Sequence, residues 1–97
     1  MPNSRYNRGR AAEYKVKAAL LSDEPNSWIV RAAGSKGEAD LVVIDNGTCL
    51  LVQVKSGKTK IGRTELSAFR RLVKRLNVQG AVAHVRPREE IDWIWIN

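Results

Sequence analysis

The sequence predicts an α/β protein in which a mixed β-sheet is flanked by helices, in the order αβββαββ. Two helical patterns, a β-hairpin signal between them and two apolar β-rich runs at the end of the chain lead to this prediction. The 97 residues are enough for one small domain with a single core. We find no internal repeat, linker or second domain, so residues 1–97 are expected to fold as one unit.

The first helix is expected over residues 10–21, after a flexible basic arm formed by residues 1–8. Apolar side chains recur at helical spacing at Ala12, Val16, Ala19 and Leu20. Turn-forming residues and a proline at 22–27 end this helix. A strand over residues 28–33 and a loop over residues 34–37 are expected to follow.

A β-hairpin over residues 40–55 is the strongest local signal. The β-branched run 41–44 predicts a buried strand, and Asn46-Gly47 is the pair that favours a tight hairpin turn. With these two residues as the loop, counting back along both strands places Asp40 opposite Gln53. Cross-strand partners have Cβ atoms roughly 4.5–5.5 Å apart on one face.

The second half of the chain begins with a basic loop over residues 56–63. Thr64 is a plausible N-cap for a helix that runs to Leu76. Two closing strands are expected over residues 80–85 and 91–96. The apolar stripe of the helix is formed by Leu66, Phe69, Leu72 and Leu76.

Three polar side chains of different chemistry meet at the open end of the hairpin. Lys55 lies two residues beyond Gln53 and therefore shares its face with Gln53 and Asp40. Carboxylate and amide oxygens are hard ligands suited to Mg²⁺, and a lysine can orient water and offset charge on a phosphate. The group predicts metal-assisted phosphodiester hydrolysis. The alternative is that these residues only solubilise the strand ends.

The chain is strongly basic, with a formal net charge of +7 and a pI near 10.1. Such a surplus indicates a polyanionic partner, either nucleic acid or an acidic membrane surface. Basic runs lie on both sides of the hairpin, which favours phosphate contacts with nucleic acid over a merely solvated helix face. The sequence contains no obvious base-reading motif, so we expect recognition of DNA structure rather than of DNA sequence.

The remaining composition bears on cellular location. Cys49 is the only cysteine, so no intrachain disulfide is possible, and its place in a predicted strand indicates a small buried hydrophobe. No apolar run approaches the about 18 residues of a membrane span, and residues 1–5 contain no apolar run typical of a secretory signal. We expect an intracellular protein with no membrane association.

The last predicted strand is apolar on both faces. Trp93 and Trp95 alternate with Ile94 and Ile96. In so small a domain one of these faces is left without a cover, so the strand predicts either ordinary core packing or a homodimer interface.

Several of these pieces together resemble the PD-(D/E)xK nuclease superfamily and, within it, the archaeal-type Holliday junction resolvases. The resemblance covers nearly the whole chain. It implies a restriction-endonuclease-like fold and a homodimeric, Mg²⁺-dependent endonuclease that resolves four-way DNA junctions by paired cuts. Mn²⁺ is expected to substitute for Mg²⁺. The matching pieces are Arg8-Gly9-Arg10-Ala11-Ala12-Glu13, residues 30–35, Asp40, Gln53-Val54-Lys55 and the closing strand.

The resemblance also implies roles for individual residues. Asp40 is the central metal ligand, with Gln53 and the Val54 carbonyl completing the protein shell. Lys55 positions the attacking water, and Glu13 binds metal directly or through water. The alternative for Glu13 is a pair with Lys17 four residues later. Arg10, Arg31 and Ser35 contact the scissile phosphate or its neighbours.

Further basic residues are expected to bind DNA around this site. They lie in the arm, the loops and the second helix, and with the arginines above the full set is Arg5, Arg8, Arg10, Arg31, Lys36, Lys58, Lys60, Arg63, Arg70, Arg71 and Arg86.

One position departs from the family pattern, because Gln53 stands where glutamate is usual. An amide oxygen can still coordinate Mg²⁺, but one negative charge is lost and metal affinity should fall. Glu38 does not replace it, since the hairpin register places Glu38 opposite Lys55 in a salt bridge. Two alternatives stay open: a related nuclease that acts on duplexes, flaps or ends, and a catalytically weak protein that binds DNA structures.

Overall fold

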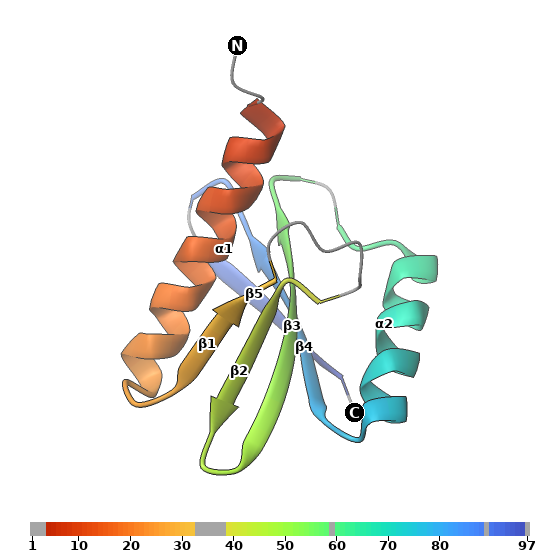
Figure 1. The fold of residues 1–97 in the computed structure, drawn as a ribbon. Helices are drawn as coiled ribbons and strands as arrows, with labels where there is room; N and C mark the ends of the chain where they lie inside the picture. The colour runs from red at the N-terminus through yellow and green to blue at the C-terminus, as the bar shows by residue number, and fades with distance from the viewer. Residues whose placement is uncertain (1–3, 33–38, 59, 89, 97) are drawn as a thin grey trace.

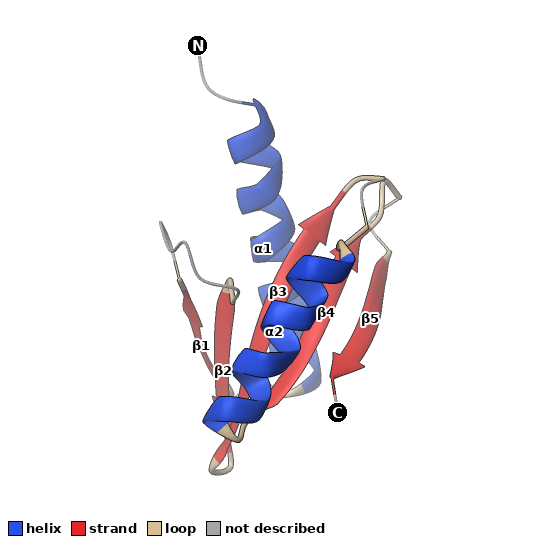
Figure 2. Ribbon diagram, turned by 90° about the vertical axis from the view of Figure 1, so that its right-hand side faces the viewer, coloured by secondary structure: helices blue, strands red, loops and turns tan. Residues whose placement is uncertain are grey.

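The computed structural model describes residues 4–32, 39–58, 60–88 and 90–96. Five strands form one sheet in the order β1-β2-β3-β4-β5, with α1 on one face and α2 on the other (Figure 1; Figure 2). All neighbouring strands are antiparallel except β3 and β4, which α2 connects as a parallel pair. The predicted order αβββαββ is confirmed: α1 (Ser4–Asp23), β1 (Trp28–Arg31), β2 (Leu41–Asp45), β3 (Thr48–Ser56), α2 (Arg63–Leu76), β4 (Gln79–Val85) and β5 (Ile91–Ile96).

The hairpin between β2 and β3 forms as predicted. Asn46 and Gly47 both have positive φ, at 49° and 75°, as a two-residue turn that matches the twist of the strands requires. Asp45 pairs with Thr48, and the register continues without interruption to Leu41 and Val52.

Two apolar clusters hold the helices to the sheet. On one face Ala12 and Val16 of α1 pack among side chains of β2, β3 and β4. On the other face Phe69 and Val73 of α2 pack against Leu51 and its neighbours. Because strand side chains alternate between faces, successive residues of β3 belong alternately to the two clusters. The sheet is therefore covered by a helix on each side.

The helices differ from the sequence prediction mainly at their ends, and α1 also runs two residues further than predicted, to Asp23. Helix α1 already begins at Ser4, so residues 4–8 of the expected arm are helical. No proline or glycine interrupts that stretch, and its residues are all tolerated in a helix. The N-cap of α2 is Gly62, in an extended conformation, rather than Thr64. Leu76 is half exposed, because the buried face of α2 includes Val73 and does not include Leu76.

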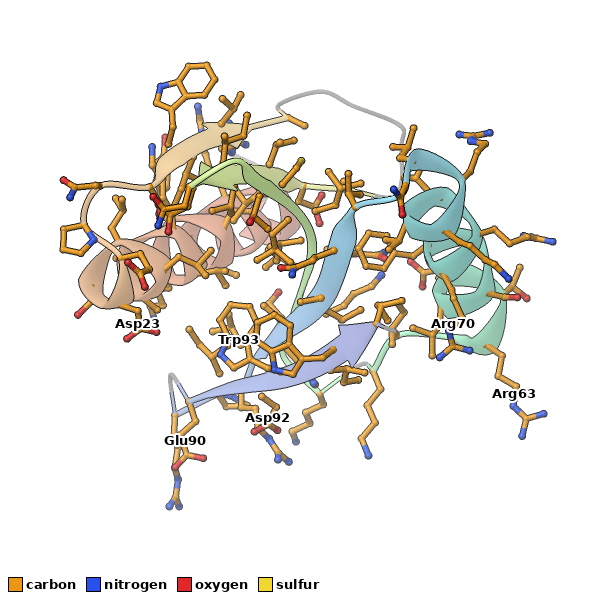
Figure 3. The ribbon with its side chains drawn as sticks, turned by 90° about the horizontal axis from the view of Figure 1, so that it is seen from below. Asp23, Arg63, Arg70, Glu90, Asp92 and Trp93 are labelled. Carbon is orange, nitrogen blue, oxygen red and sulfur yellow. The ribbon has the colours of Figure 1, made fainter. Side chains whose placement is uncertain are left out.

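The last strand, β5, lies at one edge of the sheet and spans the predicted residues. Trp93 packs against the α1-side cluster, and Ile96 is buried on the α2 side. Trp95 stacks on Trp93 with ring centroids 5.6 Å apart but is itself 58% exposed. Figure 3 shows Trp93 beside β5, seen from below. The end of this strand therefore leaves aromatic surface open to solvent.

Among the described residues, no helix has both the length and the apolar character needed to cross a membrane.

Candidate active site

Asp40 occupies a fixed position just before β2. Its backbone is held on both sides, because its carbonyl accepts from Ala32 N–H and its amide donates to the Val52 carbonyl, both at 2.8 Å. Its side chain is held as well, since Oδ2 accepts a 2.7 Å hydrogen bond from the backbone N–H of Val54. The half-buried carboxylate therefore has one oxygen bound to the sheet.

The pairing of Asp40 differs from the prediction by one position. The β2–β3 register ends at Leu41 and Val52, and the Asp40 amide bonds to Val52 instead of continuing to Gln53. As a result the Asp40 side chain reaches the backbone of Val54. In an antiparallel pair the N–H and C=O of one residue point to the same neighbouring strand, so the Val54 carbonyl also faces the side of Asp40.

The surroundings of Asp40 raise the pKa of its carboxyl above 3.8. Burial is the largest cause, and the negative charge of Glu13 adds to it. The hydrogen bond from Val54 and the positive charges of Lys55 and Arg31 act in the opposite direction. A bound cation would remove the penalty of the buried charge.

Gln53 and Lys55 project from the α2 side of β3 and meet Glu65 of α2. Lys55 Nζ lies 2.6 Å and Gln53 Nε2 lies 3.3 Å from the same oxygen, Oε2 of Glu65. An ionised carboxylate only accepts hydrogen bonds, so the NH₂ end of the Gln53 amide must face Glu65. Its other end, Oε1, is buried and finds no hydrogen-bond donor among the described residues.

Glu65 is a site residue that the sequence analysis missed. It lies in the first turn of α2, where acidic residues are common because they stabilise the helix N-terminus. Nothing in the local sequence distinguishes this glutamate from an ordinary first-turn residue. The hydrogen bond from Lys55 is the main cause that lowers the pKa of its carboxyl.

Glu13 and Arg31 form an ion pair at the α1 side of the site. Arg31 Nε lies 2.5 Å from Glu13 Oε1, and each side chain is only 18% exposed. The guanidinium also lies 5.9 Å from the ring centre of Tyr14. Glu13 of α1 therefore pairs with Arg31 of β1 and not with Lys17, the alternative partner. The charges of Glu13 and Arg31 both act on the Asp40 carboxyl, so the structure brings these three side chains into one neighbourhood.

The other predicted DNA-contacting residues are more widely spread. Ser35, Lys36 and Glu38 lie outside the described residues, and Arg5 and Arg8 lie in the first turns of α1. Arg86 follows β4 and pairs with Asp92 at 2.9 Å. Figure 3 shows Arg63 projecting from α2, away from the sheet. The exposed members of the set are Arg10, Lys58, Lys60, Arg63, Arg70, Arg71 and Arg86.

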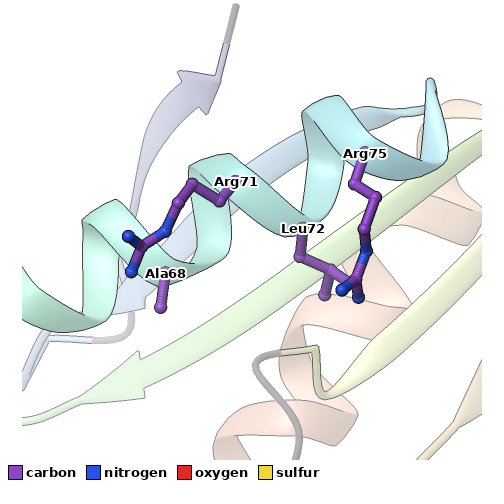
Figure 4. A pocket seen from close by; sticks show the side chains of 4 residues that line it. All are labelled: Ala68, Arg71, Leu72 and Arg75. Carbon is purple, nitrogen blue, oxygen red and sulfur yellow. The ribbon is translucent and has the colours of Figure 1, made fainter.

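A pocket of about 380 Å³ lies on α2, apart from Asp40. Arg71 and Arg75, one helical turn apart, flank it, with Ala68 and Leu72 beside them (Figure 4). Guanidinium groups bind phosphate through paired N–H donors. The pocket therefore suits contact with a phosphate backbone better than it suits an apolar ligand.

The oxygen donors at the end of the hairpin fit a hard cation. Asp40 offers its second carboxylate oxygen and Val54 its carbonyl. Gln53 offers a buried amide oxygen that has no hydrogen-bond partner within residues 4–32, 39–58, 60–88 and 90–96. In the part of the chain that the structure describes, no three His, Cys, Asp or Glu side chains lie close enough to hold a metal. A cation site here therefore depends on amide and backbone oxygens.

Comparison with solved structures identifies the fold. The structure of Archaeoglobus fulgidus Hjc, a Holliday junction resolvase from an archaeal hyperthermophile, matches with a TM-score of 0.69 and 17% identity, over 91% of this chain and 72% of that one. The crystal structure of SSO0001 matches with a TM-score of 0.55 and 16% identity, over 92% of this chain and 50% of that one. No model of a known protein family matches the sequence, and neither does any curated protein. The mixed five-stranded sheet with a helix on each face is the restriction-endonuclease-type fold of an archaeal Holliday junction resolvase.

Proposed function

We propose that the protein is a Mg²⁺-dependent endonuclease that resolves four-way DNA junctions, with Mn²⁺ able to replace Mg²⁺. The observation that carries the proposal is the arrangement at the end of the hairpin. There the Asp40 carboxylate is bound to the backbone of Val54, and the buried Oε1 of the adjacent Gln53 has no hydrogen-bond donor among the residues that the structure describes. The likeness of the fold to a resolvase adds support.

Asp40, Gln53 and the Val54 carbonyl are the groups that would hold the cation. A bound Mg²⁺ supplies activation of a water and neutralises charge on the phosphate. The raised pKa of Asp40 agrees with this assignment, because a carboxylate that is costly to bury alone gains from a bound cation. Gln53 contributes an oxygen without charge.

Lys55 and Glu13 provide the remaining chemistry. Lys55 would orient the attacking water and stabilise the negative charge that develops on the phosphate. It lies two residues beyond Gln53 on the same face of β3. Glu13 would bind the metal directly or through water, and its ion pair with Arg31 holds it in place.

The exposed arginines and lysines would bind the DNA backbone. They lie on α1, on the β3–α2 connection, on α2 and directly after β4. Phosphate contacts of this kind release counterions, so junction affinity should fall steeply as salt rises. The Arg71–Arg75 pocket is one place where a phosphate fits. Such contacts favour recognition of DNA shape over base sequence.

We further propose that the active form is a homodimer located inside the cell with its DNA. A two-fold dimer presents two equivalent sites to a junction with approximate two-fold symmetry, which allows paired cuts. Trp95, which is exposed on the edge strand β5 and stacks on Trp93, supplies the apolar surface that supports this assembly.

Gln53 favours a second candidate function, a junction-binding protein with weak catalysis. With an amide in place of a carboxylate, the Asp40 end of the hairpin carries less negative charge to hold a divalent cation. The basic surface does not depend on this residue, so DNA binding would persist.

Incubation with a synthetic four-way junction and a linear duplex, each in Mg²⁺ or EDTA, separates these candidates. A resolvase cuts the junction in Mg²⁺ only, and a duplex nuclease also cuts the linear substrate. A binding protein shifts the junction in a gel and cuts neither.

A further inference from the structure

Glu65 makes contacts that a surface residue of a helix does not need. From α2 its Oε2 reaches two residues of β3 at once, Lys55 at 2.6 Å and Gln53 at 3.3 Å. Gln53 is 8% exposed, so one of these contacts is made to a buried amide. Glu65 thus links the helix to the end of the candidate cation site.

A purely structural role would explain only part of this geometry. Glu65 is the third residue of α2, where a glutamate can face the backbone N–H of the N-cap Gly62, as in half of a capping box. The Gly62 backbone is a minor cause that lowers the pKa of the Glu65 carboxyl. Through Oε2 the same carboxylate also contacts Lys55 and Gln53. Capping alone does not require these second contacts.

The orientation of the Gln53 amide is the independent observation. Because Glu65 accepts from Nε2, the amide oxygen must point elsewhere, and there it is buried with no donor from the described part of the chain. A buried acceptor without a partner costs about 1–3 kcal/mol. A divalent cation would satisfy this oxygen.

We propose that Glu65 is the positioning residue of the cation site and supplies, from α2, the negative charge that Gln53 lacks. It turns the Gln53 amide so that oxygen rather than NH₂ faces the cation, and its charge adds to that of Asp40. This inference rests on the proposed function for the presence of the cation. It concerns how this chain compensates for an amide at position 53.

The test measures Mn²⁺ and Mg²⁺ binding to the DNA-free protein by isothermal titration calorimetry. Glu65→Gln keeps an acceptor for the Gly62 N–H, since glutamine also serves in a capping box. Loss of one charge near a divalent cation should weaken its affinity about three- to tenfold. Glu24→Gln is the matched control: it removes the same charge from an exposed residue in the turn between α1 and β1, and Figure 1 shows this turn far from the β3–α2 connection. The Glu24→Gln variant should bind Mn²⁺ and Mg²⁺ with the same affinity as the wild type.

The double variant Gln53→Glu/Glu65→Gln exchanges the two side chains and keeps the net charge. It should bind the cation at least as tightly as the wild type, because the carboxylate now stands on β3 and the new amide can donate to it. Equal affinity in the wild type and Glu65→Gln, or an exchange variant no tighter than Glu65→Gln, would overturn the inference.

Nuclear magnetic resonance provides a second measurement on the same proteins. The side-chain NH₂ signal of Gln53, identified by its absence in Gln53→Glu, should shift on addition of Mg²⁺. That shift should require a higher Mg²⁺ concentration in Glu65→Gln. An unchanged midpoint would contradict the inference even if the variant were less stable.

The two proposals can fail separately. A protein that binds Mn²⁺ in a Glu65-dependent manner but cuts no DNA refutes the nuclease proposal alone. A protein that cuts junctions while Glu65→Gln leaves cation affinity unchanged refutes only the role of Glu65.

Discussion

The backbone N–H of Val54 donates a 2.7 Å hydrogen bond to Oδ2 of Asp40. This bond ties the candidate metal-binding carboxylate to β3, the strand that also carries Gln53 and Lys55. One oxygen of Asp40 is thereby positioned, and the other is left for a ligand. Groups held in this way by a rigid sheet are pre-organised for chemistry.

Asp40→Asn should stabilise the metal-free protein at neutral pH. Because the folded state raises the pKa of Asp40, it binds the proton more tightly than the unfolded state does. The contribution of Asp40 to stability is therefore greatest below pH 3.8 and is lost as pH rises through the raised pKa. Asparagine keeps an acceptor for the Val54 N–H without the buried charge.

Thermal unfolding in EDTA between pH 4 and pH 8 checks this prediction. The melting temperature of Asp40→Asn should exceed that of the wild type at pH 7. Each 1 kcal/mol of difference in stability corresponds to about 4–8 °C in a domain of this size. The difference should shrink toward pH 4. A wild type that is the more stable protein at pH 7 would argue against an unfavourable charge at Asp40.

Gln53→Glu should lower the Mg²⁺ concentration that gives half-maximal cleavage while activity is retained. The new carboxylate adds a charged ligand beside Asp40, although it also lies close to Glu65 in the metal-free state. A Mg²⁺ titration of cleavage by both proteins measures the change. An unchanged midpoint would mean that Gln53 is not a metal ligand.

Trp95→Glu should convert a dimer into a monomer that still folds. The Trp95 side chain is 58% exposed in the single chain, so a charge there is tolerated until a second subunit covers it. The monomer should nick junctions but lose paired cutting. Trp28→Glu, at a 66% exposed tryptophan on the opposite edge of the sheet, is the control.

Light scattering at micromolar concentration gives the assembly state of all three proteins. A monomeric wild type that still makes paired cuts would refute the dimer. Dissociation by Trp28→Glu but not by Trp95→Glu would place the interface at the other edge.

Gly80→Ala should destabilise the fold by about 1–3 kcal/mol through overpacking. A Cβ at this position would lie 2.5 Å from Cγ2 of the buried Val73, which joins α2 to the sheet. Gly9→Ala is the contrasting variant, because nothing lies within 4 Å of its Cβ in α1. It should stabilise the helix by about 0.5–1 kcal/mol. Urea unfolding of both variants measures the difference, and equal stabilities would contradict the packing of α2.

The fold was predictable because its signals are local. Asn46 and Gly47 set both the turn and the register of the hairpin, so the pairing of β2 with β3 followed from the sequence. Helical and strand periodicities located the remaining elements to within a few residues. Local signals also located Asp40, Gln53 and Lys55 at one end of the sheet.

The details of the site depend on tertiary contacts and could not be predicted in the same way. The one-position shift of Asp40 arises where the β2–β3 ladder ends and the Val52 carbonyl takes its amide. Glu65 reaches Lys55 because α2 packs on one face of the sheet and its first turn thereby lies close to the end of β3. Glu13 forms its ion pair with Arg31, which is distant in sequence, and not with Lys17, which is only four residues away. Such pairings depend on how helices lie over strands, which periodicity does not specify.

Cleavage of a synthetic four-way junction by the wild type and by Asp40→Asn tests the central proposal most directly. The wild type should cut the junction in Mg²⁺ but not in EDTA. Asp40→Asn should cut at least a hundredfold more slowly, in line with the loss of a group that acts in the transition state. It should bind the junction in a gel-shift assay at least as tightly as the wild type, because affinity comes from basic side chains. Equal cleavage rates for the two proteins would contradict the assignment of the active site.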